Sequence, residues 1–149
     1  MNIRRAYPTE ADILTDLAVE SEAYWGYDKK FLDTFKTIYK ISEDFIINNP
    51  TFVLEEDKII GFYSIIESSE GVILEYFYID PSYIRKGYGK ILWDHLIEFC
   101  KNRGILELDF VASNEAMPFY EKMGAIKVGE TKSLVESDRR VNRLKMVIS

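Results

Sequence analysis

The chain has 149 residues, which fits one domain with a sizeable core, and its 47% hydrophobic and 30% charged residues are typical of a folded protein rather than a disordered one. The net charge of −6 at pH 7 argues against a general binder of nucleic acids or of anionic membranes, because such binders present cationic surfaces. Neither kind of partner is expected.

The first third of the chain predicts one short strand followed by helices. Ile3–Ala6 is the strand, and Thr9 is expected to cap a helix over Glu10–Ala23, where apolar residues recur at helical spacing. A second helix is expected near Lys29–Tyr39, which has one apolar face. Ser42 is expected to cap a short third helix.

The rest of the chain alternates between segments typical of strands and of helices. Runs rich in β-branched and aromatic residues predict strands at Thr51–Leu54, Ile59–Ile66, Val72–Ile79, Leu106–Val111, Ala125–Gly129 and Leu144–Ile148. A polar, charged loop is expected between the last two. Helices are predicted over Gly87–Asn102 and Ala116–Met123, each with a glycine close behind it. This order predicts a mixed α/β sheet with helices on both faces.

The most informative stretch is Leu74–Cys100, which predicts a strand, a turn, a Gly-x-Gly loop and a helix. A helix N-terminus has unpaired backbone N–H groups and a partial positive charge, so it binds phosphate groups well. Gly87 and Gly89 allow the backbone to approach a ligand closely. Three cations reinforce the expected phosphate site: Arg85, Lys86 and Lys90.

Other phosphate-binding loops fit this stretch less well. A P-loop requires Ser or Thr after its lysine, but Ile91 follows Lys90, and a dinucleotide fingerprint requires a third glycine where Leu92 stands. An unrelated nucleotide-binding domain is therefore disfavoured. A plain strand-to-helix turn stays open as an alternative for the loop taken alone.

Two motifs resemble the GNAT N-acetyltransferase superfamily, and the resemblance covers essentially the whole chain. Phe77–Pro81 followed by Arg85–Lys90 resembles the acetyl-CoA signature of that family, and Ala116–Ala125 resembles its Ala-x-x-Phe-Tyr-x-x-x-Gly-Phe/Ala element. Ser21–Tyr27 also resembles a bacterial subgroup of these enzymes. The resemblance implies a GNAT-like α/β fold, with a mostly antiparallel sheet of six or seven strands that splays at the cofactor strand.

The same resemblance implies acetyl-CoA as the cofactor. The backbone of three strand residues would pair with the pantetheine arm as if the cofactor were an added strand: Phe77, Tyr78 and Ile79. The loop and the first helical turn would hold the pyrophosphate: Arg85, Lys86, Gly87, Tyr88, Gly89 and Lys90. Asn114 is a further candidate, although many relatives have their asparagine where Ser113 stands here. Ile84 replaces the usual Gln or Arg of the phosphate motif, so one side-chain contact is expected to be lost.

Acetyl transfer to an amine requires a base that removes a proton from the acceptor and an acid that protonates the leaving thiolate. The resemblance implies that Tyr120 is the acid; its alternative is a core aromatic residue. Glu75 is the base candidate, because many relatives carry an acid on the cofactor strand, and alternation places it on the face of Phe77 and Ile79. A structural ion pair is the alternative for Glu75. Removal of the proton through water is another alternative, with Glu22 as a further candidate.

Several other residues have both a functional and a structural interpretation. Trp25 and Tyr27 either wall the acceptor pocket or pack the first helices against the sheet, whereas Tyr24 is expected in the core. His95, the single histidine, is expected to be structural. The charged run Glu136–Arg143 is expected to be a solvated loop, with the rim of the acceptor entrance as the alternative.

The sequence also limits the chemistry and the compartment. The single cysteine, Cys100, is expected to be buried, and one cysteine with one histidine forms neither an internal disulfide nor a structural zinc site, so no metal is expected. No run reaches the roughly 18 apolar residues of a membrane span, and the N-terminus lacks a signal-peptide hydrophobic stretch. A cytoplasmic protein is therefore expected.

These observations together predict an N-acetyltransferase that moves an acetyl group from acetyl-CoA directly to a primary amine of a small molecule or peptide. A non-catalytic module that binds or senses acyl-CoA on the same fold is the alternative, because fold alone does not fix function. A homodimer is compatible with the resemblance, since many relatives pair through their sheets.

Overall fold

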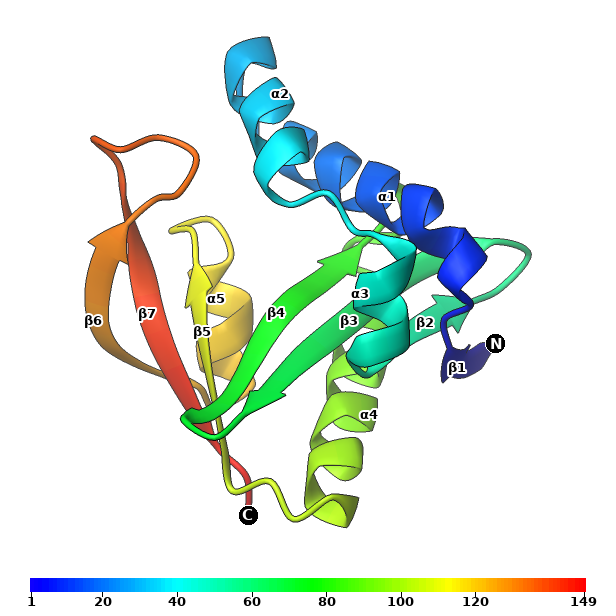
Figure 1. The fold of residues 1–149 in the computed structure, drawn as a ribbon. Helices are drawn as coiled ribbons and strands as arrows, with labels where there is room; N and C mark the ends of the chain where they lie inside the picture. Colours follow the sequence, from blue (N-terminus) through cyan, green and yellow to red (C-terminus); the bar gives the residue numbers. More distant parts are fainter.

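All seven strands join one sheet, and helices cover both of its faces (Figure 1). The computed structural model describes residues 1–149. In space the strands follow the order β1-β2-β3-β4-β5-β7-β6. They are β1 (Asn2–Arg5), β2 (Thr51–Glu55), β3 (Ile59–Ser68), β4 (Gly71–Ile79), β5 (Glu107–Ala112), β6 (Ile126–Lys132) and β7 (Arg140–Val147). The helices are α1 (Ala11–Tyr24), α2 (Lys29–Ile38), α3 (Glu43–Asn48), α4 (Tyr88–Asn102) and α5 (Met117–Lys122), with 3-10 turns η1 (Pro8–Glu10) and η2 (Pro81–Tyr83).

Capping side chains determine where the N-terminal helices begin. Asp28 before α2 and Ser42 before α3 each accept a hydrogen bond from the backbone N–H three residues later, at 2.8 and 3.0 Å. The predicted cap at Thr9 is wrong, because this residue lies within η1. At that turn the Glu10 carboxylate accepts the N–H of Tyr7 at 2.7 Å instead.

The sheet splays between β4 and β5. Five of its six strand pairings are antiparallel; β4 and β5 run parallel and pair only at Ile73 and Asp109. Figure 1 shows the two strands diverging from that point toward their C-terminal ends. The expected splay of a mostly antiparallel sheet is thus confirmed. Backbone N–H and C=O groups of β4 that face β5 beyond Ile73 are left for another partner.

A β-bulge in β4 changes the face that Glu75 occupies. The pairing with β3 shifts register here and leaves Glu75 without an opposite residue. Leu74 consequently packs in the cluster on the α4 side, and Tyr76 in the cluster on the α2 side. The expectation that Glu75 shares a face with Phe77 is wrong, because Glu75 lies near Tyr39 at the end of α2, close enough for its charge to raise the pKa of that phenol.

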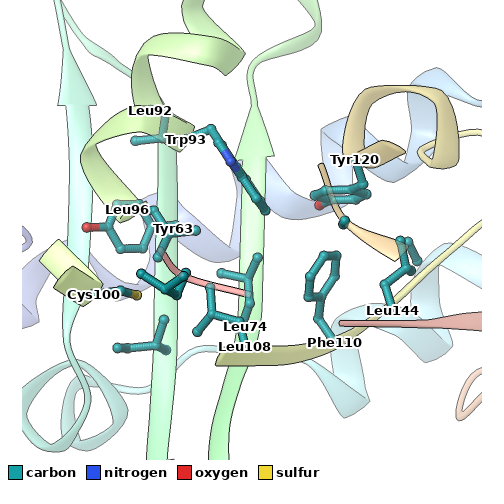
Figure 2. Close-up of a cluster of buried hydrophobic side chains, with 14 of the residues drawn as sticks. Tyr63, Leu74, Leu92, Trp93, Leu96, Cys100, Leu108, Phe110, Tyr120 and Leu144 are labelled. Atoms are coloured by element: carbon teal, nitrogen blue, oxygen red, sulfur yellow. The ribbon is translucent and has the colours of Figure 1, made fainter. Parts of the chain in front are cut away.

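Two hydrophobic clusters fill the two faces of the sheet. The first lies under α4 and α5, and Figure 2 shows Phe110 and Tyr120 of this cluster on the side opposite to Tyr63. The second lies under α1, α2 and α3, and includes Phe31 and Phe35. Burying an aliphatic or aromatic side chain stabilises the fold by about 1.5–3 kcal/mol, so both layers hold their helices firmly on the sheet.

Three residues outside the site test the sequence interpretation. Cys100 is buried as expected. His95 has a structural partner, because its Nδ1 lies 2.8 Å from the hydroxyl oxygen of Tyr63. Tyr24 is 49% exposed, so its expected place in the core is wrong.

The closing hairpin is longer than predicted. β6 runs to Lys132 and β7 begins at Arg140, so the connecting loop covers only residues 133–139. The charged run expected to be a loop is therefore divided between this loop and β7. None of the helices combines the length and the apolar character that a membrane crossing requires.

Candidate active site

The splay between β4 and β5 opens into a cavity of about 1040 Å³. Its walls come from α1, α2, the start of α4, α5 and the β6–β7 hairpin, and most of the lining residues are hydrophobic. The predicted site residues that line it are Trp25, Tyr27, Glu75, Phe77, Tyr78, Ile79, Arg85, Gly87, Gly89, Lys90 and Tyr120. The structure thus brings the predicted phosphate loop, the cofactor strand, the acid and the base candidate into one space.

The segment that joins β4 to α4 has the backbone conformation of an anion-binding nest. Arg85 (φ 66°) and Gly87 (φ 84°) are both left-handed. The first intrahelical hydrogen bond of α4 runs from the N–H of Ile91 to the carbonyl of Gly87, at 3.3 Å. The N–H groups of Tyr88–Lys90 therefore have no intrahelical acceptor, and no side chain caps them. This turn presents free donors at the positive end of a helix.

The two glycines of the loop serve different purposes. A Cβ atom on Gly87 would meet no atom within 4 Å, so glycine is required there by its positive φ alone. A Cβ atom on Gly89 would lie only 2.9 Å from Cε1 of Phe119. Gly89 therefore has a packing reason to be glycine besides the expected approach of a ligand, since it lets α5 lie close against α4. That contact also fixes Tyr120, the next residue of α5.

The three cations of the loop have different surroundings. Arg85 lines the cavity and forms no ion pair. Lys90 also lines it but lies in an ion pair of 2.7 Å with the carboxylate one helical turn later. The Nζ of Lys86 lies 5.6 Å from the ring centre of Tyr83, and Lys86 is not among the lining residues. Tyr88 is also not among the lining residues, so its side chain does not point into the cavity.

Asn114 lies outside the cavity lining, and its side chain is engaged with β7. Its Oδ1 accepts a hydrogen bond from Nδ2 of Asn142 at 2.9 Å. The buried Asn142 also donates to the carbonyl of Ala112 at 3.1 Å, which ties the end of β5 to β7. Sequence analysis did not identify Asn142, because nothing local links residues 28 positions apart.

Tyr120 is 8% exposed and lies among aromatic rings of the first cluster, with its ring 4.9 Å from that of Phe110 and 5.8 Å from that of Trp93. Its hydroxyl forms no hydrogen bond, yet no buried side-chain polar atom in the protein lacks a partner, so this hydroxyl opens onto the cavity. Burial and the nearby charge of Glu22 raise the pKa of Tyr120. The phenol is therefore protonated at neutral pH and available as a proton donor.

Two carboxylates line the cavity without an ion-pair partner. Burial raises the pKa of Glu75, and it is the single cause of that shift. Burial also raises the pKa of Glu22, against the opposing effect of a hydrogen bond of 2.8 Å from the hydroxyl of Tyr78. A carboxylate with a raised pKa accepts protons more readily than an exposed one, so either group suits a base.

A polar network closes the cavity on the side of α2. The Tyr27 hydroxyl donates to the Glu115 carboxylate at 3.1 Å, and the Arg139 guanidinium donates to the same hydroxyl. The Arg139 guanidinium also lies 4.4 Å from the centre of the Tyr27 ring and 3.6 Å from the Glu115 carboxylate. Trp25 lines the same side while 42% exposed. Trp25 and Tyr27 were predicted from the sequence. Arg139 belongs to the charged run for which the rim of the acceptor entrance was the alternative, whereas Glu115 was not predicted.

Comparison with known families agrees with this arrangement. A family model described as Acetyltransferase (GNAT) family matches residues 12–125. None of the curated proteins compared with this chain matches its sequence.

Solved structures with a similar fold are distant in sequence. A GCN5-related N-acetyltransferase from Rhodopseudomonas palustris is 18% identical with a TM-score of 0.79, over 98% of this chain and 94% of that one. The PaiA N-acetyltransferase from Thermoplasma acidophilum, solved in complex with coenzyme A, is 18% identical with a TM-score of 0.76, over 98% of both chains. The ribosomal-protein-S18-alanine N-acetyltransferase from Escherichia coli is 18% identical with a TM-score of 0.74, over 99% of this chain and 94% of that one. At these identities the likeness establishes the fold.

Proposed function

Because the chain belongs to the acetyltransferase (GNAT) family, we propose that it transfers an acetyl group from acetyl-CoA directly to a primary amine of a small molecule or peptide. The observation that carries this proposal is that β4, which lacks a neighbouring strand beyond Ile73, leads along the chain into the anion-binding nest before α4. A strand that has left its neighbour after Ile73 leads within a few residues to free N–H groups at the start of α4. An amide-bearing arm that ends in a pyrophosphate matches both features.

The residues present fit coenzyme A. On one side, Phe77, Tyr78 and Ile79 pair with β3, and on the other side they have no strand partner, so their backbone can pair with the two amides of a pantetheine arm. The left-handed Arg85 and Gly87, with the first turn of α4, suit the pyrophosphate. Support also comes from the coenzyme A bound in the Thermoplasma relative.

The chemistry needs two proton transfers that involve side chains of the cavity, one from an acid to the sulfur and one from the amine to a base. Acetyl-CoA supplies the acetyl thioester: a C–N bond forms at its carbonyl carbon, the C–S bond breaks, and coenzyme A leaves as a thiolate. Tyr120 is the proposed acid, which gives its hydroxyl proton to that sulfur; its open, protonated hydroxyl in the cavity supports this role. Glu75 and Glu22 are the two candidates for the base that takes a proton from the acceptor, whose ammonium form has a pKa near 10.4 and no free electron pair.

The acceptor side of the cavity favours a primary amine next to an apolar group. Trp25 and Tyr27 wall it, and three aromatic residues of α2 and its end continue the wall: Phe31, Phe35 and Tyr39. The unpaired carboxylates attract a cation, and the net charge of −6 attracts it from a distance. This supports an amine acceptor and leaves small molecules and peptides both within the proposal.

A homodimer is part of the proposal, because the edge strand β6 leaves two large aliphatic side chains uncovered. Ile126 is 64% exposed and Val128 is 49% exposed. An uncovered edge with apolar side chains readily adds a further strand. A second copy of this chain at β6 would cover both residues.

Calorimetric titration with acetyl-CoA, with ATP and NAD as controls, tests the cofactor assignment. Gly87→Ala forces a side chain into a left-handed conformation at the nest, whereas Gly104→Ala does the same at the far end of α4, with equal free space around it. Both variants are strained by about 1–2 kcal/mol. We expect acetyl-CoA to bind at least roughly tenfold more weakly to Gly87→Ala alone, which corresponds to about 1.4 kcal/mol.

Two results would contradict the proposal. One is a folded wild-type protein that binds ATP or NAD as tightly as acetyl-CoA; the other is equal loss of acetyl-CoA affinity in both glycine variants. Release of free thiol with a panel of primary amines then separates an enzyme from a non-catalytic acyl-CoA-binding module, which would bind acetyl-CoA and acetylate nothing.

A further inference from the structure

We propose that Glu22 of α1, held in place by the hydroxyl of Tyr78, is the base that takes the proton from the acceptor amine. This inference rests on the proposed N-acetyltransferase function and chooses between the two carboxylates of the cavity. It gives Tyr78, whose backbone was predicted to contact the cofactor, a second role through its side chain.

The end of α1 is tied to the end of the cofactor strand. The hydroxyl of Ser21 lies 2.9 Å from the carbonyl of Leu17 and 3.1 Å from the carbonyl of Ile79. Ser21 is buried, so this contact is protected from water. The next residue, Glu22, is thereby fixed beside the part of β4 that has no neighbouring strand.

The Glu22 carboxylate has one oxygen engaged and one free. Its Oε1 accepts the Tyr78 hydroxyl at 2.8 Å, which orients the group. Its Oε2 has no hydrogen-bond donor in the protein, and because no buried polar side-chain atom lacks a partner, this oxygen reaches the cavity. The half-buried Glu10, by comparison, has both oxygens bound by Arg4, at 3.0 and 2.9 Å. Only a carboxylate with a free oxygen is able to receive a proton from a bound amine.

Glu22 lies near the proposed acid, whereas Glu75 does not. The charge of Glu22 contributes to the raised pKa of Tyr120, of Tyr78 and of Tyr39. The charge of Glu75 acts on Tyr39 and on its neighbour Tyr76 and on no group of α5. Acid and base must reach the same carbonyl and amine, which favours the carboxylate next to Tyr120.

The groups that face Glu22 explain how its proton affinity is set. Burial raises the pKa of Glu22, and the hydrogen bond from Tyr78 on β4 lowers it. Arg139 in the β6–β7 loop lowers it further, and Glu115 before α5 raises it. The net direction is upward, so Glu22 is a stronger base than an exposed glutamate.

The proton transfers then balance. Glu22 accepts one proton from the acceptor ammonium and releases it to water through the open side of the cavity. Tyr120 gives its hydroxyl proton to the sulfur that leaves. The nitrogen, once acylated, loses its second proton, which restores the Tyr120 hydroxyl. In sum, an ammonium and a thioester become an amide, a thiol and one released proton.

The test compares three Glu→Gln variants in the whole protein. The amine is chosen by thiol release from phenethylamine, spermidine, kanamycin and a peptide with a free N-terminal alanine. We expect Glu22→Gln to lower kcat/KM at pH 7 by about 10²-fold or more, in the range for a lost general base. The difference in kcat/KM between Glu22→Gln and wild type should shrink as the pH rises toward the pKa of the amine, because the neutral amine then needs no base. Glu75→Gln keeps the acidic limb of the pH profile, and Glu20→Gln, on the exposed side of α1, keeps the wild-type profile.

A measurement without turnover accompanies it. Carbon NMR of labelled glutamate side chains, assigned through Glu22→Gln, gives the pKa of Glu22 directly. We expect this pKa to coincide with the acidic limb of kcat/KM. Tyr78→Phe removes a hydrogen bond that favours the ionised carboxylate, so it should move the NMR pKa and the limb together to higher pH.

Each remaining outcome overturns the assignment. An acidic limb that survives in Glu22→Gln and disappears in Glu75→Gln makes Glu75 the base. If the pKa of Glu22 differs from that of the acidic limb of kcat/KM, Glu22 is not the base. If the pKa of Glu22 does not move in Tyr78→Phe, the hydrogen bond from Tyr78 does not set it. If the wild-type protein binds acetyl-CoA and acetylates none of the amines, the proposed function fails and this inference fails with it. This failure is seen in the wild-type protein, so it is distinguishable from a failure of the Glu22 assignment, which is seen only when the variants are compared.

Discussion

Replacing Tyr120 with phenylalanine separates catalysis from packing, because the structure supplies a matched control. Tyr120 and Tyr63 are both buried tyrosines of the cluster in Figure 2, on its opposite sides. The Tyr63 hydroxyl is hydrogen-bonded to Nδ1 of His95 at 2.8 Å, whereas the Tyr120 hydroxyl has no protein partner. The same loss of one oxygen atom should therefore have opposite consequences at the two sites.

The expected magnitudes follow from those contacts. Tyr63→Phe loses one buried hydrogen bond, worth about 1 kcal/mol, which lowers the Tm of a protein of this size by roughly 2–4 °C. Tyr120→Phe loses no hydrogen bond, so its free energy of unfolding should stay within about 0.5 kcal/mol of wild type. Loss of a general acid lowers kcat by about 10²-fold or more. Because the pKa of Tyr120 is raised, wild-type kcat should show no loss of this acid as the pH rises from 7 to 9.

Thermal unfolding and thiol release from acetyl-CoA, measured on both variants, decide the matter. We expect a lower Tm with nearly normal kcat for Tyr63→Phe, and a normal Tm with low kcat for Tyr120→Phe. A Tyr120→Phe protein that keeps kcat within twofold of wild type would remove the tyrosine from the chemistry. A Tyr120→Phe protein that unfolds as early as Tyr63→Phe would show that the hydroxyl is structural.

Two further predictions concern stability and assembly. Burial raises the pKa of Glu75 above its unfolded value, so the ionised group costs stability at neutral pH; Glu75→Gln should raise the Tm at pH 7, and the gain should vanish as the pH falls below the pKa of the glutamate. An unchanged Tm at pH 7 would show that water solvates this carboxylate fully. Ile126→Lys on the exposed edge strand should convert a dimer to a monomer in sedimentation and lower the Tm by the stabilisation that association gives, and a monomeric wild type would contradict the dimer.

Local rules were sufficient where a residue acts on its own element. The predicted cap at Ser42 follows from the preference of short polar side chains for helix starts, and the cap at Asp28, which was not predicted, obeys the same rule. The left-handed Gly87 follows from the need for a sharp turn before α4. Tyr120 was identified as the acid because Ala116–Ala125 resembles a motif of the GNAT family. For the caps and for Gly87 the determining neighbours lie within a few residues along the chain.

The features that the sequence did not reveal depend on distant partners. The network of Tyr27 with Arg139 joins residues 112 positions apart, so the charged run suggested a rim of the acceptor entrance but not which residue it would contact. The bulge at Glu75 arises from the pairing of β4 with β3 and reverses the expected face. The packing role of Gly89 depends on Phe119, which belongs to another helix. Tertiary contacts decided all three.

The cavity exists because β4 and β5 lack the backbone hydrogen bonds that would join them beyond Ile73. β4 loses its ladder with β5 beyond Ile73, and each unpaired backbone group in a dry interior would cost roughly 1–3 kcal/mol. One contact limits that cost at the C-terminal end of β4: the Ser21 hydroxyl lies 3.1 Å from the carbonyl of Ile79. The cavity exposes the remaining groups to solvent or ligand. A bound pantetheine arm would restore the missing ladder, so acetyl-CoA should stabilise this region more than the rest of the sheet.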